Sequence, residues 1–280
     1  MNSIKLKAHA KVNIGLQVKY QRKDGYHNIH TIFQELELHD QILLKKKRDW
    51  SIKINDTKIP TDRSNICIQA YMAVKKQFPK IVGISITLNK HIPSGAGLGG
   101  GSSDAAAVLK GLRELYDLPL DNSELSKIAT KIGADIPFFI LGGTQIGNGI
   151  GDVLSPINKP VKGFYLLVMP DIFISTAWAY KALKKHLKLD IDRPNFANFL
   201  EGNSLSNTIF DNDFERIVIP TYPKIGKIKD GLLETGASYA SLSGSGSTVF
   251  GIYDEEAKAK QAESHFQKQY QTFLTKPTNI

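Results

Sequence analysis

The chain has 280 residues, of which 41% are hydrophobic and 22% charged, and this composition is typical of a globular protein with a buried core. Its 36 basic and 27 acidic residues give a net charge of +9, which suits an anionic partner, either a nucleic acid or a phosphorylated small molecule. The single cysteine, Cys67, excludes a disulfide scaffold, and the lack of a long apolar run or a secretory signal predicts a cytoplasmic protein.

Residues 4–18 alternate strictly between apolar and polar side chains, which predicts a strand with one buried face. Lys11 and Asn13 would then lie together on the opposite face of that strand. The turn signal Asp24-Gly25 predicts that residues 29–38 pair back onto this strand as a hairpin. The same criteria predict further strands at residues 41–47, 51–54 and 84–89, and a helix at residues 65–78.

Residues 93–103, called the glycine loop from here on, follow a predicted strand and lead into a helix predicted over residues 104–116. Glycines at such a junction let successive backbone N–H groups turn toward one point, and the helix N-terminus directs partial positive charge at the same point. Ser102 and Ser103 add hydroxyl groups. The segment therefore predicts a binding site for a di- or triphosphate, and the alternative is a connection that only caps the helix.

The glycine loop does not fit the common nucleotide motifs. Its match to the dinucleotide fingerprint, Gly95-x-Gly97-x-x-Gly100, is weak because no second strand ending in an acidic residue follows about twenty residues later. A Gly-Lys-Ser/Thr ending is missing, which excludes a Walker A loop. The signatures of protein kinases are missing too.

Beyond the loop, a capping box at Asp121 and Glu124 predicts a helix that runs to residue 132. Residues 133–141 are interpreted as a turn followed by an apolar strand. Hairpins are predicted at residues 144–154 and around 243–247, strands at 164–169 and 248–253, and helices at 175–187, 225–233 and from 254.

A polar stretch with two prolines, residues 155–162, is the candidate domain boundary. We therefore expect two domains, at residues 1–157 and 158–280. The predicted strands outnumber the helices early and mix with them late, without the regular strand–helix alternation of a doubly wound sheet. The expected fold class is α+β.

Four stretches together resemble the GHMP kinases, the family of galactokinase, homoserine kinase and mevalonate kinase. The glycine loop, Pro93–Ser103 with Asp104, is similar to the family's phosphate loop, and residues 10–16 with Asp24-Gly25-Tyr26-His27 are similar to its N-terminal signature. Gly133-Ala134-Asp135-Ile136-Pro137 resembles its catalytic-aspartate segment, and residues 241–250 resemble its C-terminal glycine loop. The resemblance implies a ribosomal-S5-domain-2-like N-terminal domain and a ferredoxin-like C-terminal domain.

Within the family, the Asp-Gly-Tyr-His and Gly-Ala-Asp-x-Pro elements resemble the branch that phosphorylates a cytidine diphosphate ester in non-mevalonate isoprenoid synthesis. The resemblance implies ATP with Mg²⁺ as the phosphoryl donor, and a small-molecule acceptor rather than a nucleic acid or a membrane. It implies that Asp135 accepts the proton of the substrate's tertiary 2-hydroxyl and that Lys11 orients Asp135 and stabilises charge. The implied ATP contacts are Pro93, Ser94, Gly95, Ala96, Gly97, Leu98, Gly99, Gly100, Gly101, Ser102 and Ser103.

The candidate substrate contacts are a polar residue beside Lys11 and three rings, because aromatic faces can stack on a pyrimidine and imidazole can bind its edge. They are Asn13, Tyr26, His27 and Tyr180, with Trp178 as a rival for Tyr180. The metal ligand stays unassigned, with Ser103 and Asp104 as possibilities.

Several alternatives stay open at this point. From spacing alone, Lys11 is a solvated strand lysine and Asp135 a turn aspartate before a proline. The chain could be another GHMP kinase, of the homoserine or mevalonate type, although Asp24-Gly25-Tyr26-His27 argues against it. The net charge of +9 also allows a non-catalytic α+β module that binds RNA or nucleotides. The sequence indicates no oligomeric state.

Overall fold

The computed structural model describes residues 2–158, 160–184, 193, 195–196, 205 and 209–278. The chain forms two compact units: unit 1 comprises Met1–Ala10, Leu38–Ser94 and Gly99–Gly142, and unit 2 comprises Lys11–Glu37, Gly95–Leu98 and Gly143–Ile280. Both units combine strands with helices, which confirms the α+β class. The units interleave along the chain, so they divide it differently from the boundary predicted after residue 157, which stays a prediction.

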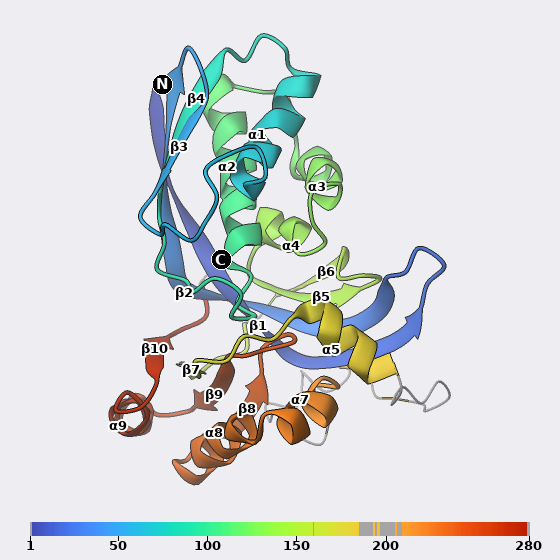
Figure 1. Ribbon diagram of the computed structural model, residues 1–280, viewed down its shortest axis with the longest axis vertical. Helices are drawn as coiled ribbons and strands as arrows, with labels where there is room; N and C mark the ends of the chain where they lie inside the picture. The colour runs from blue at the N-terminus through green and yellow to red at the C-terminus, as the bar shows by residue number, and fades with distance from the viewer. Residues whose placement is uncertain are drawn as a thin grey trace. The chain divides into compact units, whose positions relative to one another are not determined.

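Two long strands begin the chain and contribute residues to both units. They are β1 (Ser3–Gln21) and β2 (His27–Lys47), which pair with each other across the predicted Asp24-Gly25 turn (Figure 1). The two strands predicted at 29–38 and 41–47 are therefore one continuous strand. In unit 1, β2 pairs antiparallel with β4 (Gly83–Asn89), and β4 pairs parallel with the short strand β3 (Ser51–Ile54).

Four helices of unit 1 lie along one face of these strands (Figure 1). They are α1 (Ile66–Gln77), α2 (Gly100–Tyr116), α3 (Asn122–Thr130) and α4 (Ile136–Leu141). The predicted capping box is confirmed, because Asp121 and Glu124 accept hydrogen bonds from each other's backbone N–H at 2.7–2.8 Å. The side chain of Asn65 caps α1 in the same way.

The strand predicted within residues 133–141 is wrong, because these residues form helix α4. A short, fully apolar run has no periodicity that separates a strand from a buried helix, and here nearly every side chain is buried. Pro137 lies in the first turn of α4, where its missing N–H leaves no hydrogen bond unmade. The residue that precedes this helix, in the N-cap position, is Asp135.

In unit 2, residues Thr31–Gln34 of β2 pair with β5 (Thr144–Asn148), which forms the predicted hairpin with β6 (Val153–Ile157). A second, antiparallel sheet has the order β10-β7-β9-β8. Its strands are β7 (Phe164–Met169), β8 (Tyr239–Leu242), β9 (Val249–Tyr253) and β10 (Gln271–Thr275). The last of these was not predicted from the sequence.

Helices α8 (Pro223–Glu234) and α9 (Glu256–Phe266) pack against this second sheet (Figure 1). Leu166, Leu232 and Phe266 belong to one buried apolar cluster between these helices and the strands. Helix α5 (Thr176–Leu183), predicted over residues 175–187, is capped by Ser175 and contacts α7 (Glu215–Thr221). The predicted continuation of α5 over residues 185–187 lies outside the described residues.

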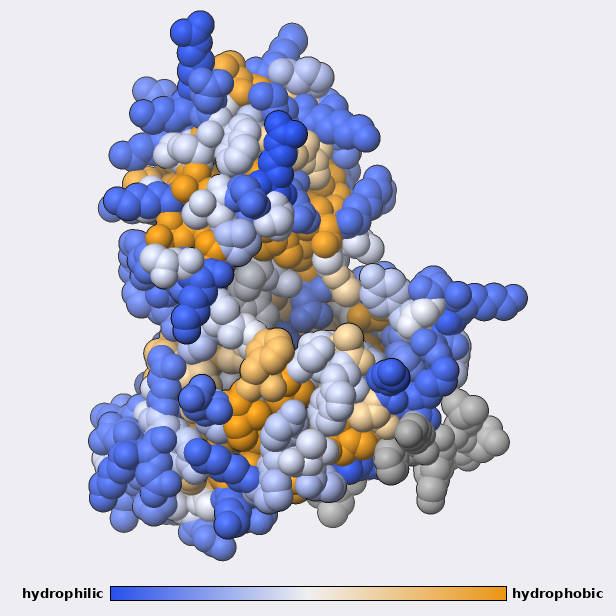
Figure 2. Space-filling view, viewed as in Figure 1, coloured by the Kyte–Doolittle hydropathy of each residue, from blue (hydrophilic) through white to orange (hydrophobic). Residues whose placement is uncertain are grey.

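Hydrophilic side chains cover much of the surface in the view of Figure 2, with hydrophobic residues exposed in patches between them. The large apolar side chains with the most exposure are Tyr20, Tyr26, Val82, Leu141, Val153 and Phe173. Among the described residues, no helix is both long enough and apolar enough to cross a membrane.

Candidate active site

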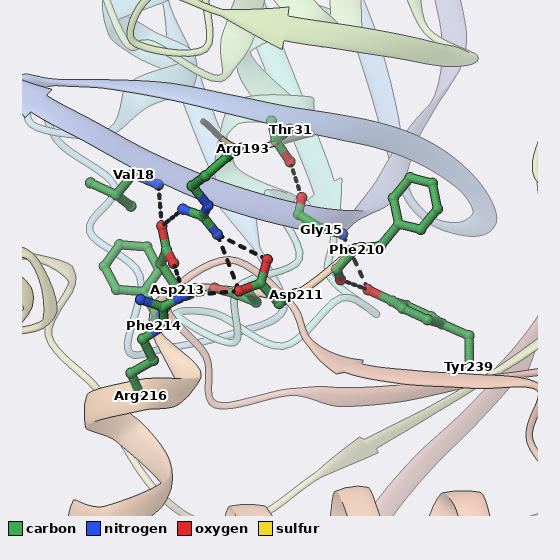
Figure 3. A network of polar contacts seen from close by, with 11 residues as sticks. Gly15, Val18, Thr31, Arg193, Phe210, Asp211, Asp213, Phe214, Arg216 and Tyr239 are labelled. Carbon is green, nitrogen blue, oxygen red and sulfur yellow. Dashed lines mark hydrogen bonds and ion pairs between the residues drawn. The ribbon is translucent and has the colours of Figure 1, made fainter. Parts of the chain in front are cut away.

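Lys11 and Asn13 lie on one side of β1, as predicted, but they are buried rather than solvated, with 4% and 1% of their surfaces exposed. The interpretation of Lys11 as a solvated strand lysine is therefore wrong. Lys11 Nζ donates to Asn13 Oδ1 at 2.6 Å, and Asn13 Nδ2 donates to Thr31 Oγ1 on β2 at 3.0 Å. Thr31 Oγ1 in turn donates to the Gly15 carbonyl at 2.7 Å (Figure 3). This hydrogen-bond chain fixes the direction of the Lys11 ammonium.

Residues 95–98 of the glycine loop lie in unit 2, against a second glycine loop formed by residues 243–247. Ser243 Oγ donates to the Gly97 carbonyl at 2.9 Å, and the Lys11 N–H donates to the Leu98 carbonyl at 3.0 Å. A Cβ placed on Gly244 would lie 3.7 Å from Lys11 Nζ. The two glycine loops and the lysine therefore meet within one unit.

In the sequence, the second glycine loop is identified only by its family resemblance. None of its residues is predicted as a site residue. Asn212 holds this loop, because its Nδ2 donates to the carbonyls of Leu242 and Gly244 at 2.8 and 2.9 Å. The Ser-Gly-Ser-Gly-Ser run at 243–247 was the signal that could have identified the loop. Asn212 carries no motif of its own.

The backbone of the glycine loop requires glycine at defined positions. Gly95, Gly97 and Gly99 have φ of 71°, 80° and 70°, in the left-handed region that disfavours other residues. A Cβ on Gly97 would lie only 2.2 Å from the Ser243 carbonyl oxygen, so the close approach of the two loops also excludes a side chain there. The loop is therefore more than a helix cap, because part of its shape serves contact with a second loop.

In unit 1, the remaining residues of the loop are Pro93, Ser94 and Gly99–Ser103. Helix α2 begins at Gly100, four residues earlier than predicted, so residues 100–103 form its first turn. The N–H groups at the start of a helix have no partner within the helix and are suited to binding phosphate oxygens. The start of α2 is therefore suited to a phosphate, and phosphate binding by the loop stays a prediction.

Asp104 does not fit the role of a magnesium ligand. Its carboxylate is buried and accepts a hydrogen bond from Lys90 Nζ at 2.7 Å. Ser103 is also buried. Over residues 2–158 and the other described ranges, no group of three or more His, Cys, Asp or Glu side chains is arranged to hold a metal ion.

Asp135 is half-buried in unit 1, at the N-cap position of α4. The turn that presents it is closed by the Ile136 N–H, which donates to the Gly133 carbonyl at 3.3 Å. Lys11 belongs to unit 2. The partnership of Asp135 with Lys11 in catalysis stays a prediction.

Two of the predicted substrate contacts lie together in unit 2. The rings of His27 and Tyr180 stack with centroids 5.0 Å apart. His27 is buried, and its Nε2 has no hydrogen-bond partner among the residues that the structure describes. Burial, followed by the positive charge of Lys184, lowers the pKa of His27 below its usual value. The lowered pKa favours the neutral imidazole, and the buried Nε2 is left without a hydrogen bond from the described residues.

Trp178, the alternative to Tyr180 as a stacking residue, contacts a different ring. Trp178 packs edge to face against Tyr222, with centroids 5.8 Å apart. Tyr26 is 58% exposed at the turn between β1 and β2. Of the two aromatic residues of α5, the structure brings Tyr180 to His27.

A polar network ties β1 to a segment about 200 residues later (Figure 3). Asp213 Oδ2 accepts from the Val18 N–H at 2.7 Å and from Arg193 Nη1 at 2.5 Å. Arg193 Nη2 donates to Asp211 at 2.9 Å, and Arg216 pairs with the same carboxylate at 3.1 Å. The network holds residues 211–213 beside the strand that carries Lys11.

The same strand is held at Gly15 by a buried tyrosine (Figure 3). The Gly15 N–H donates to Tyr239 Oη at 3.1 Å, and Tyr239 Oη donates to the Phe210 carbonyl at 2.7 Å. Burial raises the pKa of Tyr239, so its hydroxyl keeps the proton that it donates.

Comparisons with known proteins place these features in context. The sequence matches the family models described as GHMP kinases N terminal domain, over residues 65–143, and GHMP kinases C terminal, over residues 180–272. It is 40% identical to a 4-diphosphocytidyl-2-C-methyl-D-erythritol kinase of Chlorobium chlorochromatii, covering 96% of this chain and 95% of the relative. It is 42% identical to the protein of the same name from Alkaliphilus oremlandii, covering 100% and 98%.

Solved structures of GHMP kinases are also similar to this chain. A crystal structure of 4-(cytidine 5'-diphospho)-2C-methyl-D-erythritol kinase is similar with a TM-score of 0.84 and 29% identity, over 99% of this chain and 100% of that one. Homoserine kinase from Cytophaga hutchinsonii is similar with a TM-score of 0.79 and 20% identity, over 99% and 95%. The second likeness is one of fold alone.

Proposed function

This chain belongs to the GHMP kinases, within them to the 4-diphosphocytidyl-2-C-methyl-D-erythritol kinases, and we propose that it phosphorylates the 2-hydroxyl of 4-(cytidine 5'-diphospho)-2-C-methyl-D-erythritol with ATP. The observation that carries the substrate is the stacked pair of His27 and Tyr180, in the unit that also holds Lys11. A neutral imidazole with a buried, unpartnered nitrogen is suited to a hydrogen bond with a cytosine edge. Tyr26, and the part of the Tyr180 ring that His27 does not cover, supply aromatic surface for the base.

The chemistry is the transfer of a phosphoryl group between two oxygens. The substrate 2-hydroxyl oxygen bonds to the γ-phosphorus while the bond from that phosphorus to the β–γ bridging oxygen breaks, and ADP leaves. Asp135 accepts the hydroxyl proton as general base. Lys11, aimed by its hydrogen bond to Asn13, stabilises negative charge on the transferring group.

The phosphates of ATP fit the backbone of the glycine loop and the start of α2 at residues 100–102, where the N–H groups precede the first helical hydrogen bond, from the Ser103 N–H to the Gly99 carbonyl. Mg²⁺ would neutralise part of the phosphate charge, and it is typically held through one or two protein carboxylates, substrate phosphates and water. We propose that the ion arrives bound to the phosphates of the nucleotide.

The proposal gives the protein a place in isoprenoid precursor biosynthesis in the cytoplasm, with a small molecule as its substrate and neither nucleic acid nor membrane as a partner. The basic charge then serves anionic ligands, since both ATP and the cytidine diphosphate ester carry negative charge.

The test is a substrate panel with the full chain, ATP and Mg²⁺. We expect ADP release with 4-(cytidine 5'-diphospho)-2-C-methyl-D-erythritol, and a phosphomonoester product in the ³¹P NMR spectrum. Homoserine and mevalonate, offered at the same concentrations, should give no more ADP than ATP alone. Turnover of either one in preference to the cytidine ester would reject the proposed acceptor while keeping the kinase assignment.

A further inference from the structure

A buried ion-pair network in unit 1 lies against the start of helix α2, where the glycine loop ends. Lys90 Nζ pairs with Asp40 Oδ2 and with Asp104 Oδ2, the latter at 2.7 Å. Only 7% of the Lys90 side chain is exposed, and the two carboxylates are more deeply buried still. Burying three ionisable side chains costs a desolvation free energy that their mutual attraction offsets only in part. The place where the protein accepts this cost is therefore informative.

The network joins the two ends of the loop. Lys90 lies three residues before Pro93, where the loop begins, and Asp104 lies in helix α2 just after Ser103, where the loop ends. A Cβ placed on Gly100, the first residue of α2, would lie 3.2 Å from Lys90 Nζ. The ammonium therefore sits against the first helical turn, on which the proposed phosphate contacts depend.

The first end of the loop is fixed to the rest of unit 1 by the same network. Asp40 Oδ1 accepts from the backbone N–H groups of His91 and Ile92 at 2.5 and 2.8 Å. The side chain of Asn55 holds the backbone of Lys90 on both sides, accepting from its N–H at 2.7 Å and donating to its carbonyl at 3.2 Å. Residues 90–92 are thus a rigid support, and Lys90 extends that support across to α2.

We infer that Lys90, Asp40 and Asp104 are positioning residues that hold the two ends of the glycine loop together and so set the loop's affinity for ATP. The inference rests on the proposed function, because it concerns how the same loop binds the phosphates. Backbone N–H groups bind an anion well only when they point at it before it arrives, since ordering them on binding lowers the affinity. Lys90 and Asp104 do that ordering in advance.

The protonation of the network agrees with this role. Burial raises the pKa of Asp104 to about 8, and although burial lowers the pKa of Lys90, its two carboxylate neighbours raise it overall. Asp104 therefore serves mainly as a hydrogen-bond acceptor for Lys90. An asparagine at this position has the same shape and the same acceptor oxygen.

The test compares Asp104→Ala with Asp104→Asn in the full chain. We expect Asp104→Ala to raise the Kd for a non-hydrolysable ATP analogue and the KM for ATP about tenfold, because a buried hydrogen bond to a charged group is lost. The KM for the cytidine ester should stay within about threefold of the wild-type value. Asp104→Asn should bring the Kd and KM for ATP back to within about threefold of wild type, because Lys90 keeps its acceptor.

Tyr116→Phe is the matched control, on the same helix but at its other end. It removes a hydrogen bond of 2.7 Å from Tyr116 Oη to the Gly83 carbonyl, far along α2 from the glycine loop. It should lower the thermal stability without changing the Kd for the ATP analogue.

An Asp104→Ala protein that melts lower but binds the ATP analogue like wild type would overturn the inference and leave Asp104 with a structural role only. If Asp104→Ala does not fold, Asp40→Asn and Lys90→Gln supply the same comparison of analogue affinity with stability. Failure of the proposed function is distinguishable, because it would be seen as absent turnover of the cytidine ester by the wild-type protein.

Discussion

The imidazole of His27 lies face to face with the phenol ring of Tyr180, with centroids 5.0 Å apart and planes inclined by 20°. Tyr180 also contacts the ring of Phe214 edge to face, with centroids 4.9 Å apart. A pyrimidine ring does not fit between two rings already in contact, so a base that stacks on Tyr180 must displace His27 or approach another part of the ring. His27 is therefore better suited to a hydrogen bond through Nε2 than to a sandwich.

Replacing His27 with alanine should impair the cytidine substrate and spare ATP. The lost hydrogen bond alone costs about 0.5–1.5 kcal/mol, and a base left buried without a partner raises the cost to about 1–3 kcal/mol, so kcat/KM for the cytidine ester should fall about ten- to a hundredfold. The KM for ATP should stay within a few fold of wild type. Steady-state kinetics with each substrate varied in turn measure both effects.

The control for His27 is His39→Ala, which removes a half-buried ring of the same strand whose neighbour is His9, at 5.3 Å. It should leave both KM values unchanged. Equal impairment of the two substrates by His27→Ala would assign this residue to the core of unit 2 instead.

Asp135→Asn should abolish most turnover and preserve ATP binding. The change is nearly isosteric and removes the basic oxygen that accepts the proton, a contribution of roughly 10²- to 10⁴-fold in rate. Single-turnover kinetics give the rate of the chemical step, and titration with a non-hydrolysable ATP analogue gives the affinity. Asp121→Asn makes the same change at the N-cap of α3 and should retain full activity, because asparagine caps a helix as well as aspartate does. Retention of near wild-type turnover by Asp135→Asn would exclude this residue as the base.

Gly97→Ala should destabilise unit 2 and weaken ATP binding. Two effects add at this position, the left-handed backbone at φ of 80° and a Cβ that would lie 2.2 Å from the Ser243 carbonyl oxygen. The backbone effect alone is about 1–2 kcal/mol, whereas the collision must move one glycine loop away from the other. Thermal unfolding and binding of an ATP analogue measure the two consequences.

Gly25→Ala separates these effects. Gly25 has φ of 88°, but a Cβ there would meet nothing within 4 Å, so this variant reports the cost of the backbone alone. We expect a small loss of stability and an unchanged affinity for ATP. If Gly97→Ala behaved no differently from Gly25→Ala, the contact between the two glycine loops would not matter to either property.

The stability of the wild-type protein should fall relative to that of Asp104→Asn as the pH rises from about 6 to 8. Burial raises the pKa of Asp104 from 3.8 to about 8, so between these values the folded state holds a proton that the unfolded state has released. The contribution of Asp104 to the free energy of unfolding is therefore largest below about pH 4, and it is lost as the pH rises through 8. The difference between the two proteins should change by up to about 2 kcal/mol over this range. Denaturant unfolding at several pH values checks it, and parallel profiles would contradict it.

Much of the fold and of the site follows from local patterns in the sequence. The Asp121 capping box, the Ser175 cap of α5 and the glycine loop each depend on residues within a few positions of one another, so the sequence alone reveals them. The structure brings the rings of His27 and Tyr180 together, but their role as substrate contacts came from a family resemblance and stays a prediction.

The features that the sequence could not reveal depend on distant parts of the chain. The alternation of apolar and polar residues in β1 predicts that Lys11 is exposed. Lys11 is buried because both faces of β1 are packed at this point. Strand β10 is a short edge strand defined mainly by its pairing with β7. Asn212 acts through backbone carbonyls of the second glycine loop, and no local pattern predicts such a contact.

The strand that carries Lys11 has consequences for how the protein is made. Its N–H groups at Gly15 and Val18 bind Tyr239 and Asp213, which lie 224 and 195 residues further along the chain. A nascent polypeptide leaving the ribosome therefore contains the lysine almost from the start but lacks these partners until most of translation is complete. Because contacts of such sequence separation close late and slowly, the strand stays incomplete throughout elongation. Kinase activity should accordingly appear only on release of a nearly full-length chain, and ribosome-bound fragments that stop before residue 239 should be inert.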